Sequence, residues 1–223
     1  MFKSTQRPIV IPQSEHLKLA GALAQLWGNA EFELPPLPQL SVLAGIALHD
    51  RAFGYLDDLP VGTEVDDADW LPMTRNGFTM PCADPIADLI TRHHLLRLVS
   101  GRDTPARRVL AEEMRGVIRE QIDQHGLDAG LFLQIDRMTK FCDFVAFDFC
   151  LEKATEGQVE VFARYASAEL RIVRYRIDGN EIILDPWPLQ VAEVRGYLVG
   201  FQLQGYPERL DGLVIPYHIR PLR

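Results

Sequence analysis

Histidines occupy positions that the sequence otherwise gives to apolar helix faces. His16, His49 and His93 each fall in an apolar stripe with helical spacing, and Asp50 directly follows His49. Each histidine alone is most simply interpreted as a hydrogen-bonded core residue, because burying a polar group costs little once it is paired. Together they indicate one interior in which imidazole and carboxylate groups satisfy one another or bind a metal ion.

A further helix would have to supply one more acid to this interior. Asp143 is the first choice and Asp136 the second; they are seven residues apart, so they project from nearly the same side of a helix. Imidazole combined with carboxylate suits manganese, iron, nickel or zinc better than calcium. The residues therefore predict a divalent transition metal bound by His16, His49, Asp50 and one of the two acids.

Helical periodicity dominates the chain as far as residue 155, and strand patterns follow it. The spacing of apolar residues predicts helices over residues 14–27, 39–53, 85–99, 104–124 and 129–153. A hairpin is predicted around Gly179, with further strands over residues 194–204 and 213–219. We therefore expect a mainly α fold, with a helical domain over 1–155 and a small β-rich extension over 156–223 packed on it as an antiparallel sheet.

The stretch between residues 56 and 84 contains glycine, proline and five aspartates that lack the spacing of a calcium-binding loop, which favours a solvated loop. The aspartates are Asp57, Asp58, Asp66, Asp67 and Asp69.

Charge and composition exclude several classes of partner. The formal net charge of −8 disfavours nucleic acid, whose phosphates an acidic protein repels. The chain has no apolar run long enough to cross a membrane and no secretion signal, so a cytoplasmic location is expected. None of the three cysteines forms a CxxC pair, which argues against thiolate zinc sites. A small anionic molecule remains a possible ligand, since a metal or local arginines can reverse the charge of one pocket.

Two segments resemble the HD-domain superfamily of metal-dependent phosphohydrolases. The run SEHLKLAGALA, which contains His16, resembles the first helix of that superfamily, and VLAGIALHD, which ends in His49 and Asp50, resembles its second ligand-bearing helix. The order His, His-Asp and a later Asp is the superfamily pattern, with Asp143 or Asp136 as its last member. The resemblance implies an HD-like helical bundle and the hydrolysis of a phosphate ester by metal-activated water.

The same resemblance implies roles for residues outside the ligand set. His93 and His94 stand where two-metal members place further histidines, so either could hold a second ion, bind substrate or protonate the leaving group. Arg92, Arg97 and Arg137 are candidates for contacts with a substrate anion.

The chain is also similar, over nearly its whole length, to a family of uncharacterised bacterial proteins that has no established activity. The similarity lies in five motifs: Gln13-Ser14-Glu15-His16, Trp27-Gly28-Asn29, the His49-Asp50 pair, Asp84-Pro85 leading into a helix with Arg92-His93, and Asp185-Pro186-Trp187-Pro188.

Two other functions stay open at the level of sequence. Some HD-like proteins use the same ligands with two irons as oxygenases, which His93 and His94 would permit. The helical pocket could instead belong to a sensor or binding module without catalysis. The predicted sheet could cover the pocket or build a homo-oligomer.

Overall fold

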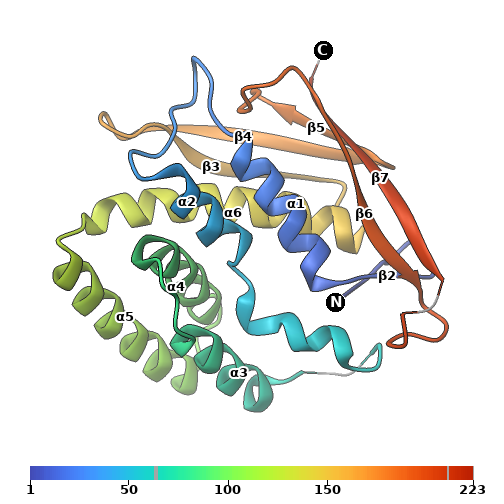
Figure 1. Ribbon diagram of the computed structural model, residues 1–223, viewed down its shortest axis with the longest axis horizontal. Helices are drawn as coiled ribbons and strands as arrows, with labels where there is room; N and C mark the ends of the chain where they lie inside the picture. The colour runs from blue at the N-terminus through green and yellow to red at the C-terminus, as the bar shows by residue number, and fades with distance from the viewer. Residues whose placement is uncertain (63–64, 210, 223) are drawn as a thin grey trace.

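The computed structural model describes residues 1–62, 65–209 and 211–222, and combines a group of helices with one large curled sheet. The helices are α1 (Gln13–Gln25), α2 (Gln39–Ala47), the 3-10 helix η1 (Arg51–Asp58), α3 (Asp67–Thr79), α4 (Pro85–Ser100), α5 (Pro105–His125) and α6 (Ala129–Leu151). The strands are β1 (Phe2–Lys3), β2 (Ile9–Ile11), β3 (Glu156–Arg164), β4 (Glu169–Asp178), β5 (Glu181–Asp185), β6 (Val194–Gln202) and β7 (Gly212–Pro221). In Figure 1 the helices lie below and to the left of the sheet, and α6 runs along it.

The sheet has seven strands in the order β1-β2-β6-β7-β5-β4-β3. All neighbours are antiparallel except β5 and β7, which are parallel. The expected hairpin exists as β4 and β5, with Gly179 at a positive φ in its turn. The first strands of the chain join strands near its end, since Ile9 pairs with Gln202.

This architecture corrects the expected fold class. An HD-like helical bundle with a small C-terminal antiparallel sheet is wrong: the sheet is large, mixed and curled, and it takes in strands from both ends of the chain. The short strands at Phe2–Lys3 and Ile9–Ile11 carry too few residues for an alternating pattern to stand out. Parallel pairing between β5 and β7 depends on distant residues and has no local sequence signal.

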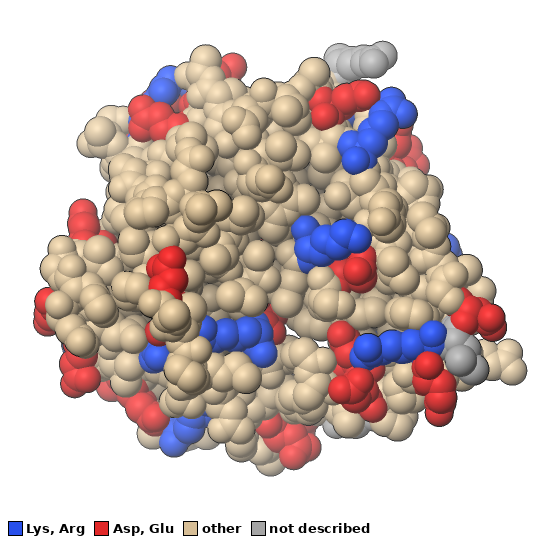
Figure 2. Space-filling view, in the orientation of Figure 1, with Lys and Arg blue, Asp and Glu red and all other residues tan. Residues whose placement is uncertain are grey.

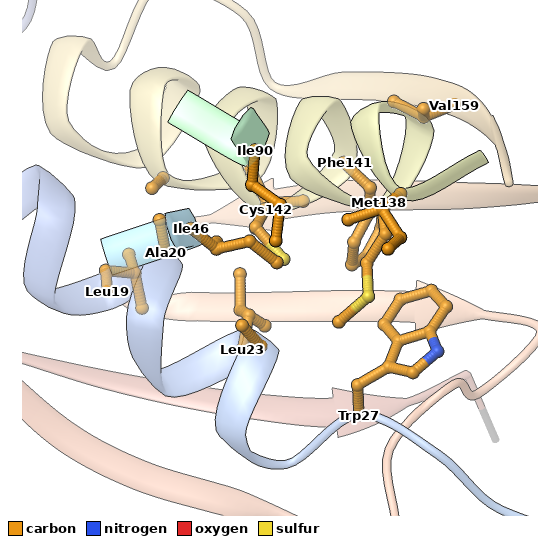
Figure 3. Close-up of a cluster of buried hydrophobic side chains, with 14 of the residues drawn as sticks. Leu19, Ala20, Leu23, Trp27, Ile46, Ile90, Met138, Phe141, Cys142 and Val159 are labelled. Atoms are coloured by element: carbon orange, nitrogen blue, oxygen red, sulfur yellow. The ribbon is translucent and has the colours of Figure 1, made fainter. Parts of the chain in front are cut away.

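The core lies where α1, α2, α4 and α6 meet the inner face of the sheet. Figure 3 shows α1 side chains facing side chains of α2, α4 and α6. Its labelled members are Leu19, Ala20, Leu23, Trp27, Ile46, Ile90, Met138, Phe141, Cys142 and Val159, all buried. Gly45 allows α2 to approach α4 closely, because a Cβ there would lie 2.7 Å from the Cβ of Ile90.

Helix α2 is shorter than the range 39–53 that the apolar pattern predicts. It ends at Ala47, and η1 begins at Arg51 after a turn. The imidazole Nδ1 of His49 lies 2.7 Å from the Ile46 carbonyl oxygen, which the backbone amide of His49 also contacts at 3.3 Å. The side chain thus competes for a carbonyl that a continuing helix would use.

Helix α3 occupies part of the stretch that was expected to be a solvated loop. Asp66 caps it by accepting hydrogen bonds from the amides of Ala68 and Asp69, which is the usual role of an aspartate at an N-cap. Asp66, Asp67 and Asp69 therefore mark the start of a helix rather than a loop. None of the described helices has the length and apolar character that crossing a membrane requires. In Figure 2 uncharged residues dominate the upper middle of this face, oppositely charged side chains meet near its centre, and more charged side chains lie across its lower half and along its rim.

Candidate metal centre

Four buried side chains converge where α1, the turn after α2, and α6 meet. His16 comes from α1, His49 and Asp50 from the turn, and Asp143 from α6. One ligand atom from each lies within 4.8 Å of the other three. Both histidines are fully buried, while the Asp50 and Asp143 side chains keep exposures of 12% and 8%. The aspartates therefore mark the side from which a ligand can approach.

The separations between these atoms fit one metal ion. His16 Nε2 lies 3.0 Å from His49 Nε2 and 3.4 Å from Asp143 Oδ1, and His49 Nε2 lies 3.5 Å from the same oxygen. Asp50 Oδ2 is 3.7 Å from His16 Nε2 and 3.9 Å from His49 Nε2. With bonds of about 2.1 Å, two ligand atoms lie about 3.0 Å apart at a right angle and about 3.4 Å apart at the tetrahedral angle. These two nitrogens and two oxygens could therefore surround one ion.

A hydrogen bond on the far side of the His49 imidazole supports an orientation in which its Nε2 faces the cluster. His49 Nδ1 donates to the Ile46 carbonyl, so the neutral ring presents the lone pair of Nε2 to the cluster. His16 Nδ1 is buried and has no hydrogen-bond partner among the described residues. The two Nε2 atoms face each other, and two lone pairs at such a distance need a proton or a cation between them.

Asp50 is held from two sides by side chains that do not belong to the cluster. The side-chain amide of Gln13 donates to Asp50 Oδ2, and His94 Nε2 lies 2.8 Å from Asp50 Oδ1. Gln13 was not predicted as a site residue, although the interval from Gln13 to His16 is one helical turn and places both on one face. This spacing could have identified Gln13 as a site residue from the sequence.

Arg97 determines the tautomer of His94. Its Nη2 lies 2.7 Å from His94 Nδ1, and a guanidinium can only donate, so Nδ1 is the acceptor and Nε2 carries the proton. His94 therefore donates to Asp50 and has no lone pair to offer an ion. Arg97 is held in turn by Asp136, whose oxygens lie 3.0 and 3.2 Å from its Nε. Of the two alternative acids, Asp143 lies in the cluster and Asp136 orients Arg97.

The remaining predicted residues lie elsewhere. His93 stacks on Phe132 at a centroid distance of 5.8 Å, with a buried Nε2 that has no partner among the described residues. Arg92 is bound to Asp88. Arg137 contacts Glu160 on the sheet. None of the three belongs to the four-residue cluster.

The charges of the cluster are strongly coupled. Burial acts to lower the pKa of His49, but Asp50 and Asp143 outweigh it and raise that pKa. Burial acts to raise the pKa of Asp50, yet His49 and the hydrogen bond from His94 bring it down to about 2. The pKa of Asp143 falls well below its usual range despite burial, because hydrogen bonds with His16 and His49, and the positive charge of His49 when that ring is protonated, stabilise its carboxylate in the metal-free fold. Burial, His49 and Arg97 lower the pKa of His94, which agrees with a neutral ring.

A cavity of about 550 Å³ opens beside the cluster, and Asp50 and Asp143 form part of its wall. Phe53, Phe144 and Tyr175 are among its other lining residues. The cluster thus combines ligand atoms for an ion with an adjacent space for an organic molecule.

Asp57 was expected to be solvated, but it is buried and supports the start of α1. Both of its carboxylate oxygens accept from the backbone amide of Gln13, at 2.8 and 2.9 Å. It therefore caps α1 from a distance and helps to fix the helix that carries His16.

One protein family matches the sequence: residues 1–204 match the family described as "Protein of unknown function (DUF3891)". No curated protein and no solved structure matches the chain.

Proposed function

We propose that this chain, which belongs to the DUF3891 family, is a hydrolase that uses one divalent metal ion and acts on a phosphate ester. The observation that carries the proposal is the convergence of two imidazole nitrogens and two carboxylate oxygens, 3.0–3.9 Å from one another where measured, beside a cavity. His16, His49, Asp50 and Asp143 would hold the ion. Manganese, iron, nickel and zinc all accept such a mixed donor set.

An ion in this place supplies a water-derived nucleophile near neutral pH, because it lowers the pKa of the water that it binds. The protein's own residues do the positioning. Gln13 and His94 fix both oxygens of Asp50, and the Ile46 carbonyl fixes His49. The cavity provides room for the substrate on the side of the two aspartates.

The donor geometry favours one ion over the two irons of an oxygenase. A second ion beside the cluster would need His93 or His94 as a ligand. His94 Nε2 carries a proton because Arg97 donates to Nδ1, and the His93 ring stacks on Phe132 instead. Arg97 also stands 3.6 Å from Asp143, so it provides a fixed positive charge beside the centre for a phosphate oxygen.

The phosphate ester is an inference from the HD-like order of the ligands. His16, His49-Asp50 and Asp143 follow one another along the chain in the order of that superfamily's motif, and the four lie together. In such a reaction a hydroxide formed from water would attack phosphorus, the ester P–O bond would break, and the leaving alcohol oxygen would take up the proton that the water had lost.

Elemental analysis and turnover of p-nitrophenyl phosphate test the proposal. We expect one equivalent of a transition metal and metal-dependent release of p-nitrophenol. A His49→Ala, Asp50→Ala double variant should retain its fold and lose both. The matched control is Asp123→Ala, His125→Ala, which changes the same residue types at an exposed helix end and should lose neither.

Each result has a distinct meaning. Absence of metal from a folded parent, even after reloading, contradicts the metal centre. Full metal content without turnover of any phosphate monoester contradicts the hydrolase and favours a binding or sensor protein.

A further inference from the structure

We propose that the cavity beside the metal centre selects phosphate monoesters whose organic part is apolar, of aromatic size, and neutral or positively charged. This inference rests on the proposed function, since it places the phosphoryl group at the metal centre. It goes further by specifying the alcohol that is released, and it argues against substrates that carry a second phosphate.

The walls of the cavity are mainly apolar. Phe53, Leu98, Phe144 and Phe147 line it together with the ring of Tyr175. Phe144 and Phe147 stand on α6 close after Asp143, and they retain exposures of 37% and 40%. Aromatic walls that stay partly exposed gain free energy when they cover an apolar ligand. A volume of about 550 Å³ is within the range of pockets that bury small organic molecules.

Gly157 makes room for the tyrosine that forms part of this wall. A Cβ on Gly157 would lie 2.3 Å from the Tyr175 hydroxyl and ring, so any larger residue would displace that ring. The two residues face each other across β3 and β4. The absence of a side chain at this position therefore allows the aromatic wall to form.

Apart from Gln158 and the Tyr175 hydroxyl, the polar side chains that line the cavity are carboxylates, which accept hydrogen bonds. Asp148 accepts a hydrogen bond from the Tyr175 hydroxyl through Oδ2, and among the described residues no other side chain donates to its carboxylate. The remaining oxygen can accept from a hydroxyl or an ammonium group of a ligand. Asp50, Asp143 and Asp148 give this cavity three carboxylates.

No lysine or arginine is among the described residues that line the cavity. Arg97 stands beside Asp143 at the centre, and Lys140 lies outside, 5.1 Å from the Phe144 ring centroid. One phosphoryl group can be neutralised by the ion and Arg97. A second phosphate or a carboxylate deeper in the cavity would meet carboxylates without a cation, which is costly in a partly buried site. The charge distribution therefore opposes polyphosphates.

Calorimetric titration with phosphonates tests this inference, because the P–C bond resists hydrolysis. The metal content of the protein is measured first. Phenylphosphonate should then bind at least about tenfold more tightly than methylphosphonate, since the ring adds several buried apolar carbons. The 4-(aminomethyl) derivative should bind as tightly as phenylphosphonate or more so, and the 4-carboxy derivative should bind at least about tenfold more weakly.

Two variants connect the result to this cavity. Phe144→Ala should weaken the binding of phenylphosphonate and leave the binding of methylphosphonate unchanged. Leu133→Ala, at an exposed position on the same helix, should change neither affinity. Asp148→Asn should narrow the difference between the aminomethyl and carboxy derivatives. Asp123→Asn, at an exposed position, is its control and should leave that difference intact.

The failures can be told apart. A folded protein that takes up no metal overturns the proposed function and this inference with it. A protein that takes up metal but binds all four phosphonates equally overturns only the substrate class. Tighter binding of the carboxy derivative would also overturn it.

Discussion

Two buried polar clusters lie on either side of the short segment from His49 to Arg51, and their chemistry differs. On one side, the two oxygens of Asp88 accept from Arg51 at 2.7 Å, Arg92 at 2.7 Å and Gln121 at 3.1 Å. On the other side, His16, His49, Asp50 and Asp143 bring nitrogen lone pairs and carboxylates together. The first cluster contains its own cations, whereas the second presents acceptors to one point.

The difference shows why buried charge alone does not identify a functional site. The carboxylate of Asp88 and the guanidinium groups of Arg51 and Arg92 satisfy one another, and they connect η1 to α4. Among the atoms of this cluster, Gln121 Oε1 has no partner in the described residues. The four-residue cluster lacks a cation of its own at its centre, and His16 Nδ1 is also left without a partner among the described residues. Excess acceptors at one point indicate an ion, whereas matched donors and acceptors indicate structure.

The largest expected effect is the loss of the structural cluster. Asp88→Ala would leave two buried guanidinium groups without their carboxylate, and we expect the free energy of unfolding to fall by about 3–5 kcal/mol. Urea denaturation of the parent, of this variant and of the exposed control Asp123→Ala measures it. A loss as small as that of the control would show that the Asp88 cluster does not stabilise the fold.

Added metal should stabilise the protein only through the cluster of His16, His49, Asp50 and Asp143. At a free metal concentration one hundred times the dissociation constant, the parent should gain about 2.7 kcal/mol in unfolding free energy. Asp88→Ala, if it stays folded, should gain the same amount, and His16→Gln should gain almost none. Thermal denaturation with and without added metal distinguishes them. Equal gains in the parent and in His16→Gln would remove the distinction between the clusters.

A smaller effect is expected from Arg97, which acts through His94. Arg97→Gln should lower metal affinity by about ten- to hundredfold, as is typical when the support of a ligand is removed. Arg108→Gln, at an exposed position on α5, should leave affinity unchanged. Competition titration with a chelating dye measures both. Unchanged affinity in Arg97→Gln would mean that the tautomer of His94 does not matter to Asp50.

The smallest effect is a dependence on pH. The pKa of His49 is raised in the metal-free fold by Asp50 and Asp143, so a proton competes with the ion below that pKa. Metal affinity should therefore rise by up to about tenfold per pH unit and level off once pH passes the raised pKa.

The metal-free fold should show the opposite dependence. A raised pKa means that His49 contributes stability below its unfolded value of 6.5, and this contribution disappears as pH rises through the folded pKa. A metal affinity that stayed constant from pH 6 to 8.5 would contradict the first expectation. An unfolding free energy of the metal-free protein that stayed constant over the same range would contradict the second.

The candidate site was more predictable than the fold. Helical periodicity and the His-Asp pair pointed to His16, His49 and Asp50, with Asp143 or Asp136 as the further acid, because polar groups on apolar stripes stand out in a sequence. The expected geometry was partly wrong, since His49 and Asp50 lie on a turn beyond Ala47 and not on a helix face. Only the contact between the His49 ring and the Ile46 carbonyl explains that ending.

The features that the sequence could not show depend on contacts between residues that are far apart in the chain. The partners of Ile9 and of β5 lie far along the chain, so no local pattern announces them. Asp57 looked like one of several loop acids, yet it is buried against the start of α1. The role of Asp136 in orienting Arg97 also required the structure, because seven residues of helical spacing make Asp136 and Asp143 equivalent in the sequence.

The pairing of β2 with β6 has a consequence for biosynthesis. Strand β2 runs directly into α1, so the segment that carries His16 is anchored by residues of β6 that leave the ribosome long after it. Until then the Ile9–Ile11 strand has no neighbour on that edge, and its apolar side chains are available to chaperones or to neighbouring chains. His16 is thus synthesised well before the strand that anchors the start of its helix.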